Sequence, residues 1–135
     1  MCIRDSDGEW QQSIGQTGDG VGQFNRPNGV AVDADGDIYV ADWMNNRVQV
    51  FAPDGRFITM FRGDAALSKW GKDKLNSNPD MIRQRNIAYA NDPTYEQKFA
   101  HPCGVRIDEK GRIAIIDHTR GRIQVYVKED EPVLR

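Results

Sequence analysis

Three residues with the chemistry of transition-metal ligands lie in the last third of the sequence, namely His101, Cys103 and His118. Imidazole nitrogens and thiolate sulfurs bind such metals well. A His-x-Cys spacing is by itself a weak signal, and a surface histidine beside a small buried cysteine gives the same pattern. We therefore predict no cofactor, and a divalent metal held by these three residues is the alternative.

Two pairs of opposite charge could also serve catalysis: Asp42 with Arg47, and Asp117 with Arg122. The pairs have the same spacing, and a catalytic site is not normally duplicated within one chain. An aspartate at the end of a strand can accept hydrogen bonds from loop N–H groups, and an arginine can pair with it. We expect a structural role for all four residues.

The acidic stretch DADGD at 33–37 looks like a calcium-binding loop at first sight. Such a loop needs an acidic group at positions 1, 3 and 5, glycine at position 6 and glutamate at position 12. Here glycine falls at position 4 and the twelfth residue is Met44. The stretch is more typical of a tight hairpin turn, which is what we predict.

These residues lie within a repeat. Residues 24–51 and 99–126 align without a gap at an offset of 75, with 11 identities in 28 positions. Alternating apolar residues and turn residues predict short strands in each copy. In the first copy the predicted strands are 29–33, 38–42, 47–51 and, just beyond the aligned region, 56–61.

A meander of four short antiparallel strands cannot bury both of its faces alone. Several such sheets stacked around an axis can, so we predict an all-β fold of β-propeller blades, each with four antiparallel strands. Residues 7–14 align with 54–61 at an offset of 47, which predicts the outer strand of a preceding blade. The longer offset of 75 contains a blade and an insertion. Pro79 marks a helix start in it, and 64–75 could form another short helix.

The pattern of the two copies is P-x-G-V-x-[VI]-D, then G-x-I, then a strand that ends in Asp, then x4-R-[VI]-Q-V-[FY]. It resembles the NHL repeat of β-propeller proteins, and the resemblance covers 7–62 and 99–126. The Asn-His-Leu triplet of the family is absent, because the corresponding loops read WMNNR and HTRGR. No function can therefore be assigned to that triplet here.

The six segments that follow from these features differ in character. They are a leader at 1–6, which matches nothing in the repeats and reads as an artificial start; the outer strand of a preceding blade at 7–15; a complete blade at 24–62; a helical insertion at 63–98; three strands of the next blade at 99–127; and a tail at 128–135. A propeller needs at least about four blades to close. We expect the other blades to come from further chain, and homo-oligomerisation is the alternative.

In an up-and-down blade, the loop between the second and third strands and the connection between blades emerge on one face. Loops 43–46 and 118–121 and the insertion therefore share this side, which we call the upper face. We predict a scaffold that binds a protein or a small-molecule ligand there. The candidate binding residues are Trp43, Asn45, His101, Cys103, His118 and Arg120.

The resemblance also implies two rival functions. NHL-type propellers include amidating lyases that hold a metal with histidines, so part of a metal-dependent enzyme, amidating-lyase-like or lactonase-like, is the alternative to a non-enzymatic scaffold. Some NHL domains bind RNA through basic upper faces. Acidic residues nearly neutralise the basic ones of the insertion here, so nucleic acid is the weakest candidate.

Composition adds little to these predictions. The net charge of −2 gives no electrostatic attraction toward nucleic acid or anionic lipid. No apolar run approaches the ~20 residues of a membrane helix, and we expect no membrane partner. The start MCIRDSDGEW has no apolar signal-peptide region, but it reads as truncated, so the cellular location stays open.

Overall fold

The computed structural model describes residues 1–64, 72–73, 76–91 and 97–128. Its helical elements include the 3-10 turn η1 (Trp43–Asn45) and the helix α2 (Pro79–Asn91), and no described helix is long and apolar enough to cross a membrane. The strands are β1 (Cys2–Arg4), β2 (Trp10–Ser13), β3 (Gln16–Thr17), β4 (Gln23–Phe24), β5 (Pro27–Val32), β6 (Ile38–Asp42), β7 (Arg47–Phe51), β8 (Phe57–Phe61), β9 (Pro102–Ile107), β10 (Arg112–Asp117) and β11 (Arg122–Val127).

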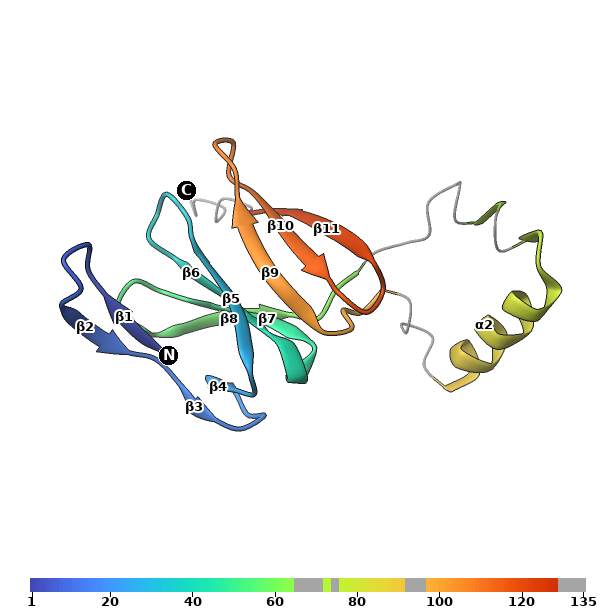
Figure 1. Cartoon of the computed structure of the whole chain (residues 1–135), viewed down its shortest axis with the longest axis horizontal. Coiled ribbons are helices and arrows are strands. Elements are labelled where there is room, and N and C mark those ends of the chain that lie inside the picture. The colour runs from blue at the N-terminus through green and yellow to red at the C-terminus, as the bar shows by residue number, and fades with distance from the viewer. Residues whose placement is uncertain (65–71, 74–75, 92–96, 129–135) are drawn as a thin grey trace, which may run out of the picture.

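Four consecutive antiparallel strands form the central sheet, in the order β5-β6-β7-β8, which we call the first blade. The sheet β9-β10-β11 repeats its first three strands, and we call it the second blade. Strands β1 and β2 pair as an antiparallel hairpin, the first hairpin, on the other side of the first blade (Figure 1). This arrangement confirms the predicted all-β fold of antiparallel blades with a small helical segment.

The first residues lie within this arrangement, whereas we expected a leader outside it. Cys2–Arg4 forms β1, and its hairpin with β2 takes the places of the third and fourth strands of a preceding blade. The turn between them is closed by bonds from Asp5 N to Glu9 O and from Gly8 N to Asp5 O. Equivalent bonds close the β7–β8 turn 47 residues later. A strand of only three residues carries too little pattern to be recognised from the sequence.

The inner hairpin turn is built alike in both blades. One carboxylate oxygen of Asp33 accepts hydrogen bonds from two backbone N–H groups of its turn, and Gly36 completes the turn with a φ of 87°. Asp108 and Gly111 do the same in the second blade, where the glycine φ is 77°. Glycine accepts this left-handed conformation without steric cost. The stretch at 33–37 is therefore a hairpin turn, as predicted.

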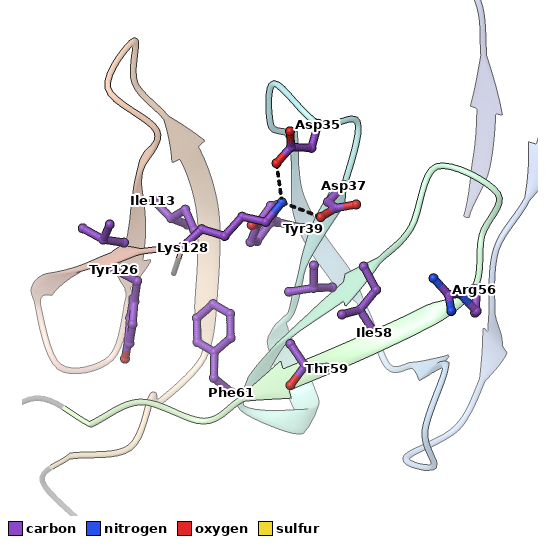
Figure 2. Close-up of a pocket in the computed structure, with 12 residues that line it drawn as sticks. Asp35, Asp37, Tyr39, Arg56, Ile58, Thr59, Phe61, Ile113, Tyr126 and Lys128 are labelled. Atoms are coloured by element: carbon purple, nitrogen blue, oxygen red, sulfur yellow. Dashed lines mark hydrogen bonds and ion pairs between the residues drawn. The ribbon is translucent and has the colours of Figure 1, made fainter. Parts of the chain in front are cut away.

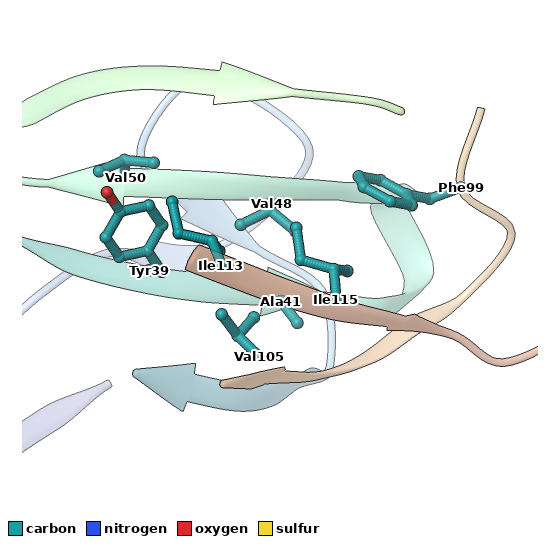
Figure 3. Packing of buried hydrophobic residues seen from close by; sticks show 8 residues of the cluster. All are labelled: Tyr39, Ala41, Val48, Val50, Phe99, Val105, Ile113 and Ile115. Carbon is teal, nitrogen blue, oxygen red and sulfur yellow. The ribbon is translucent and has the colours of Figure 1, made fainter. Parts of the chain in front are cut away.

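Equivalent positions build the two apolar clusters that join the sheets. Between the first hairpin and the first blade lie Ile14, Phe24, Ile38, Val40 and Phe51. Their counterparts between the two blades are Phe61, Phe99, Ile113, Ile115 and Tyr126. Figure 3 shows Ile113 and Ile115 of the second blade against Val48 and Val50 of the first. The same set of five apolar positions thus recurs at both junctions between the sheets.

The backbones of the two blades approach closely where β5 runs beside β9. A Cβ atom added to Gly29 would lie 2.9 Å from the Cα atom of Gly104 and 3.2 Å from the nitrogen of Val105. Any larger residue would force the two inner strands apart. A glycine at this position of the first copy therefore sets the spacing of the blades.

Helix α2 begins where the sequence predicts. The side-chain oxygen of Asn78 accepts hydrogen bonds from the N–H groups of Asp80 and Met81, and Pro79 is the first helical residue. The helix lies apart from the sheets in Figure 1. Most of the second helix that we expected at 64–75, and all of the tail beyond residue 128, lie outside the described residues.

Candidate binding site on the upper face

Asp42, at the upper end of β6, organises the connection that enters the first blade. One of its carboxylate oxygens accepts a hydrogen bond from the backbone N–H of Asn25 at 2.8 Å. The other accepts from the Arg47 Nε atom at 3.0 Å, and this pair is almost completely buried. The Arg47 Nη2 atom donates to the carbonyl oxygens of Gly20 and Gln23. The pair therefore holds the entering chain through its backbone groups.

Asp117 and Arg122 make the same contacts in the second blade. Asp117 accepts from the backbone N–H of Ala100 at 2.8 Å and from the Arg122 Nε atom at 2.9 Å. Arg122 donates to the carbonyl oxygen of Lys98 at 3.0 Å. Its side chain is 25% exposed, whereas that of Arg47 is 2% exposed. These contacts of the four charged residues all lie within the blades and the connections that enter them.

Trp43 and His101 bring the two blades together on the upper face. Their ring centroids are 4.6 Å apart with an angle of 34° between the planes. The His101 ring also forms a hydrogen bond with the Thr119 hydroxyl at 2.7 Å, and its backbone N–H donates to the Asn46 side chain. His101 has a φ of 59°, and Arg26, its counterpart before Pro27, has a φ of 56°. The same left-handed backbone conformation thus carries an arginine in the first blade and a histidine in the second.

A pocket of about 460 Å³ opens on this face between the blades. Its cationic lining groups are Arg62, which follows β8, Lys98, which precedes β9, and Arg120 in the β10–β11 loop. Asn45 and Asn46 add amide groups, and no carboxylate of the described residues lines it. Three cationic side chains of the described residues thus line one space, although the net charge of the chain is −2.

The predicted binding residues separate into two groups. Asn45 and Arg120 line this pocket, and the Trp43–His101 pair lies beside it through Asn46. Cys103 is half-buried in β9, and the exposed His118 contacts His101 only through the backbone among the interactions described. No three His, Cys, Asp or Glu side chains of the described residues are grouped so that they could hold a metal. The geometry gives the metal alternative no support.

Sequence reasoning did not select Arg62, Lys98 and Asn46 for this site. Arg62 and Lys98 flank the insertion at 63–98. They are far apart in the chain, but the hydrogen bond from Phe99 N to Arg62 O joins the two ends of the insertion at 2.7 Å. The predicted up-and-down topology places both ends of the insertion at the upper face. The sequence therefore indicated that Arg62 and Lys98 lie there.

A larger cavity of about 680 Å³ lies between the outer parts of the two blades (Figure 2). At the equivalent place before the first blade, the Phe57 ring packs against Phe51 at 6.0 Å. The counterpart of Phe57 in the second copy is residue 132, outside the described residues. The cavity therefore does not by itself indicate a ligand. Burial and a hydrogen bond to Asp33 raise the pKa of Tyr39, in its lining, to about 12.

Comparison with known families matches residues 24–51 to the NHL repeat. The full-length relatives that this chain resembles are much longer than it. It is 33% identical to Protein brain tumor of Drosophila melanogaster over 129 residues, covering 84% of this chain and 12% of that protein. It is 34% identical to the B-box type zinc finger protein ncl-1 of Caenorhabditis elegans over 129 residues, covering 84% of this chain and 15% of that protein.

A shorter and more similar match involves E3 ubiquitin-protein ligase TRIM71 of Rattus norvegicus. The identity is 58% over 45 residues, which is 33% of this chain and 5% of that protein. The chain thus spans less than a sixth of each of these relatives, so their whole-protein activities do not transfer to it as findings.

Proposed function

Because this chain belongs to the NHL-repeat family, we propose that it is a binding scaffold whose upper face takes a ligand with an anionic group. The observation that carries the proposal is the pocket between the blades, in which Arg62, Lys98 and Arg120 face the same space. The blades fix the walls of this pocket, so the cations are held together before a ligand arrives. Pre-organisation of this kind lowers the entropy lost on binding.

The Asp42–Arg47 and Asp117–Arg122 pairs support this function indirectly. They fix the backbone of the connections from which the pocket is built, including Lys98 and Ala100. The residues that would bind the ligand therefore differ from the residues that hold the backbone of this face. Substitutions in the pocket should alter binding without unfolding the blades.

The proposal is tested with two labelled probes, a decaglutamate peptide and a pool of random-sequence single-stranded RNA nonamers. Fluorescence anisotropy measures the dissociation constant of each probe for the wild-type chain. The variants Arg62→Ala and Arg120→Ala should weaken binding by about tenfold each, as is typical for the loss of a charge-assisted contact. Arg56→Ala, on the opposite side of the first blade, is the control. Equal affinity of all three variants for both probes would refute the proposed site.

Single-stranded RNA is a second candidate, favoured by one specific observation. The Trp43–His101 ring pair lies beside the cationic pocket, and aromatic surfaces next to cations are a common means of binding unpaired bases. A Trp43→Ala variant separates the candidates, because it should weaken binding of the RNA pool about tenfold and leave the peptide unaffected. The same loss for both probes would assign Trp43 to the shape of the pocket and reject base stacking.

A further inference from the structure

The two histidines of the chain, His101 and His118, both lie on the upper face, but their surroundings differ. The His101 ring stacks on Trp43, with ring centroids 4.6 Å apart, and its Nδ1 atom lies 2.7 Å from the Thr119 hydroxyl oxygen. Among the interactions of the described residues, those of His118 are backbone hydrogen bonds with His101 and Gly121. His101 is therefore the histidine whose ring is held in one place.

The backbone of His101 is fixed beside the pocket between the blades. Its N–H donates to the side chain of Asn46 at 2.9 Å. Asn46 lines the pocket, and so does Ala100, the residue directly before His101. Thr119, the partner of the ring, directly precedes the pocket residue Arg120. A positive charge on the His101 ring would therefore lie next to the cations of the pocket.

Both contacts of the His101 ring are compatible with a protonated imidazole. A hydroxyl can donate to a bare ring nitrogen or accept from a ring N–H, so the bond with Thr119 can persist when the ring gains a proton. A cation within about 6 Å of a tryptophan ring is attracted to its face, so the stack on Trp43 becomes more favourable. Imidazole is the side chain that changes its charge between about pH 5 and 8.

The charged groups on the segments packed against this ring are of two kinds. The ion pairs Asp42–Arg47 and Asp117–Arg122 each have no net charge. The cations of the pocket, Arg62, Lys98 and Arg120, oppose a further positive charge. An anion in the pocket would offset these three cations. Proton uptake by the ring and binding of an anion should therefore favour each other.

The first blade carries a permanent positive charge at the same position. Arg26 is the counterpart of His101 and also directly precedes the proline of the inner strand. The φ angles of the two residues are 56° and 59°. Arginine is always charged in proteins, whereas histidine gains or loses its charge near neutral pH. The chain thus places a fixed cation in one blade and a pH-dependent one in the next.

We propose that His101 makes anion binding at the upper face depend on pH. Protonation of its ring adds a fourth cation beside the pocket, so an anionic ligand binds more tightly as the pH falls through the titration range of imidazole. This inference rests on the proposed function, because the pocket supplies the other three cations.

Fluorescence anisotropy with the labelled decaglutamate peptide at pH 6.0 and 8.0 tests the inference, since glutamate carboxylates stay ionised at both values. The wild-type chain should bind about threefold more tightly at pH 6.0, as expected for one exposed charge contact. His101→Arg, which introduces the residue of the first blade, should bind at pH 8.0 as tightly as the wild type does at pH 6.0. His101→Gln should bind equally at both values. His118→Gln is the control and should keep the pH dependence.

NMR of the imidazole protons follows each histidine separately, because the chain has two. The titration curve of His101 should move to higher pH when the peptide is bound, whereas that of His118 should not. A pH dependence that persists in His101→Gln or disappears in His118→Gln, while binding still requires Arg62, would overturn this inference alone. Binding that Arg62→Ala and Arg120→Ala leave unchanged would refute the proposed function, and the role of His101 with it.

Discussion

The two blades share a sequence pattern but differ in what surrounds them. All residues of β6 and β7 are buried, because the first hairpin covers one face of the first blade and the second blade covers the other. In the second blade, the described residues cover only the face toward the first blade, and they leave β11 largely exposed. The same residue type is therefore buried to a different extent in each copy. The energetic value of a repeated residue is set by its neighbouring blade.

This comparison makes Asp42 and Asp117 a matched pair, and they should give the largest difference. Asp42→Ala leaves the guanidinium of Arg47 buried without its counter-ion, which costs about 3–5 kcal/mol of unfolding free energy. Asp117→Ala should cost less, about 1–2 kcal/mol, because Arg122 can reach water. Urea denaturation followed by tryptophan fluorescence measures both. Equal losses would mean that burial by a neighbouring blade does not control the strength of this contact.

The apolar faces give the next largest effect. Val48→Ala removes a fully buried side chain between the blades and should cost about 2 kcal/mol. Ile123→Ala, at the equivalent position, should change the unfolding free energy by less than about 0.5 kcal/mol. The same urea experiment applies. A large loss at Ile123 would indicate that its face is covered in solution.

The glycines of the inner strands offer a smaller contrast. Gly29→Ala would place a methyl group against the backbone of β9, and separating the strands should cost about 1.5 kcal/mol. In Gly104→Ala the nearest atom would be the end of the Ile116 side chain at 3.2 Å, which can rotate away. Thermal melts of the two variants should therefore differ. A neutral Gly29→Ala would contradict the close spacing of β5 and β9.

The smallest expected effect concerns Tyr39, whose counterpart in the second copy is Ala114. Burial and the hydrogen bond to Asp33 raise its pKa to about 12 from 10.0. The folded state thus keeps a proton that the unfolded chain loses, so this stabilisation is complete below pH 10 and decreases as the pH rises toward 12. Tyr39→Phe should show a smaller decrease in stability over that range. Absorbance at alkaline pH should show one fewer late-titrating tyrosine, although the raised pKa of Tyr126 will still contribute.

The sequence predicted the parts of the fold that depend on local pattern. The apolar run of β6, the alternating residues of β7, and glycine in the turns at Gly36 and Gly111 carry their information within a few residues. The class of fold followed from the repeat, because a lone meander leaves a face uncovered. Strand β1 was missed because it has only three residues, and its pairing depends on a turn whose pattern is weak.

The candidate site was predicted less completely, for a physical reason. Trp43, Asn45, His101 and Arg120 followed from the expected topology, which places their loops on one face. The pocket, however, also needs Arg62 and Lys98, which are separated by the whole insertion and meet only because Phe99 bonds back to Arg62. Contacts that depend on closure of a long loop have no local signal. The binding role of all these residues remains a prediction.

The contacts of Asp42 and Arg47 have a consequence for how such chains can diversify. These side chains contact the connection that enters the blade only through its backbone N–H and carbonyl groups. Asp117 and Arg122 do the same in the second blade. Any residue type can supply those groups, and any length of chain can precede them. The connection into the first blade is short, and the one into the second carries α2 and its flanking segments, yet both are held alike. Each blade entrance is therefore a place where new sequence can be inserted without disturbing the sheet.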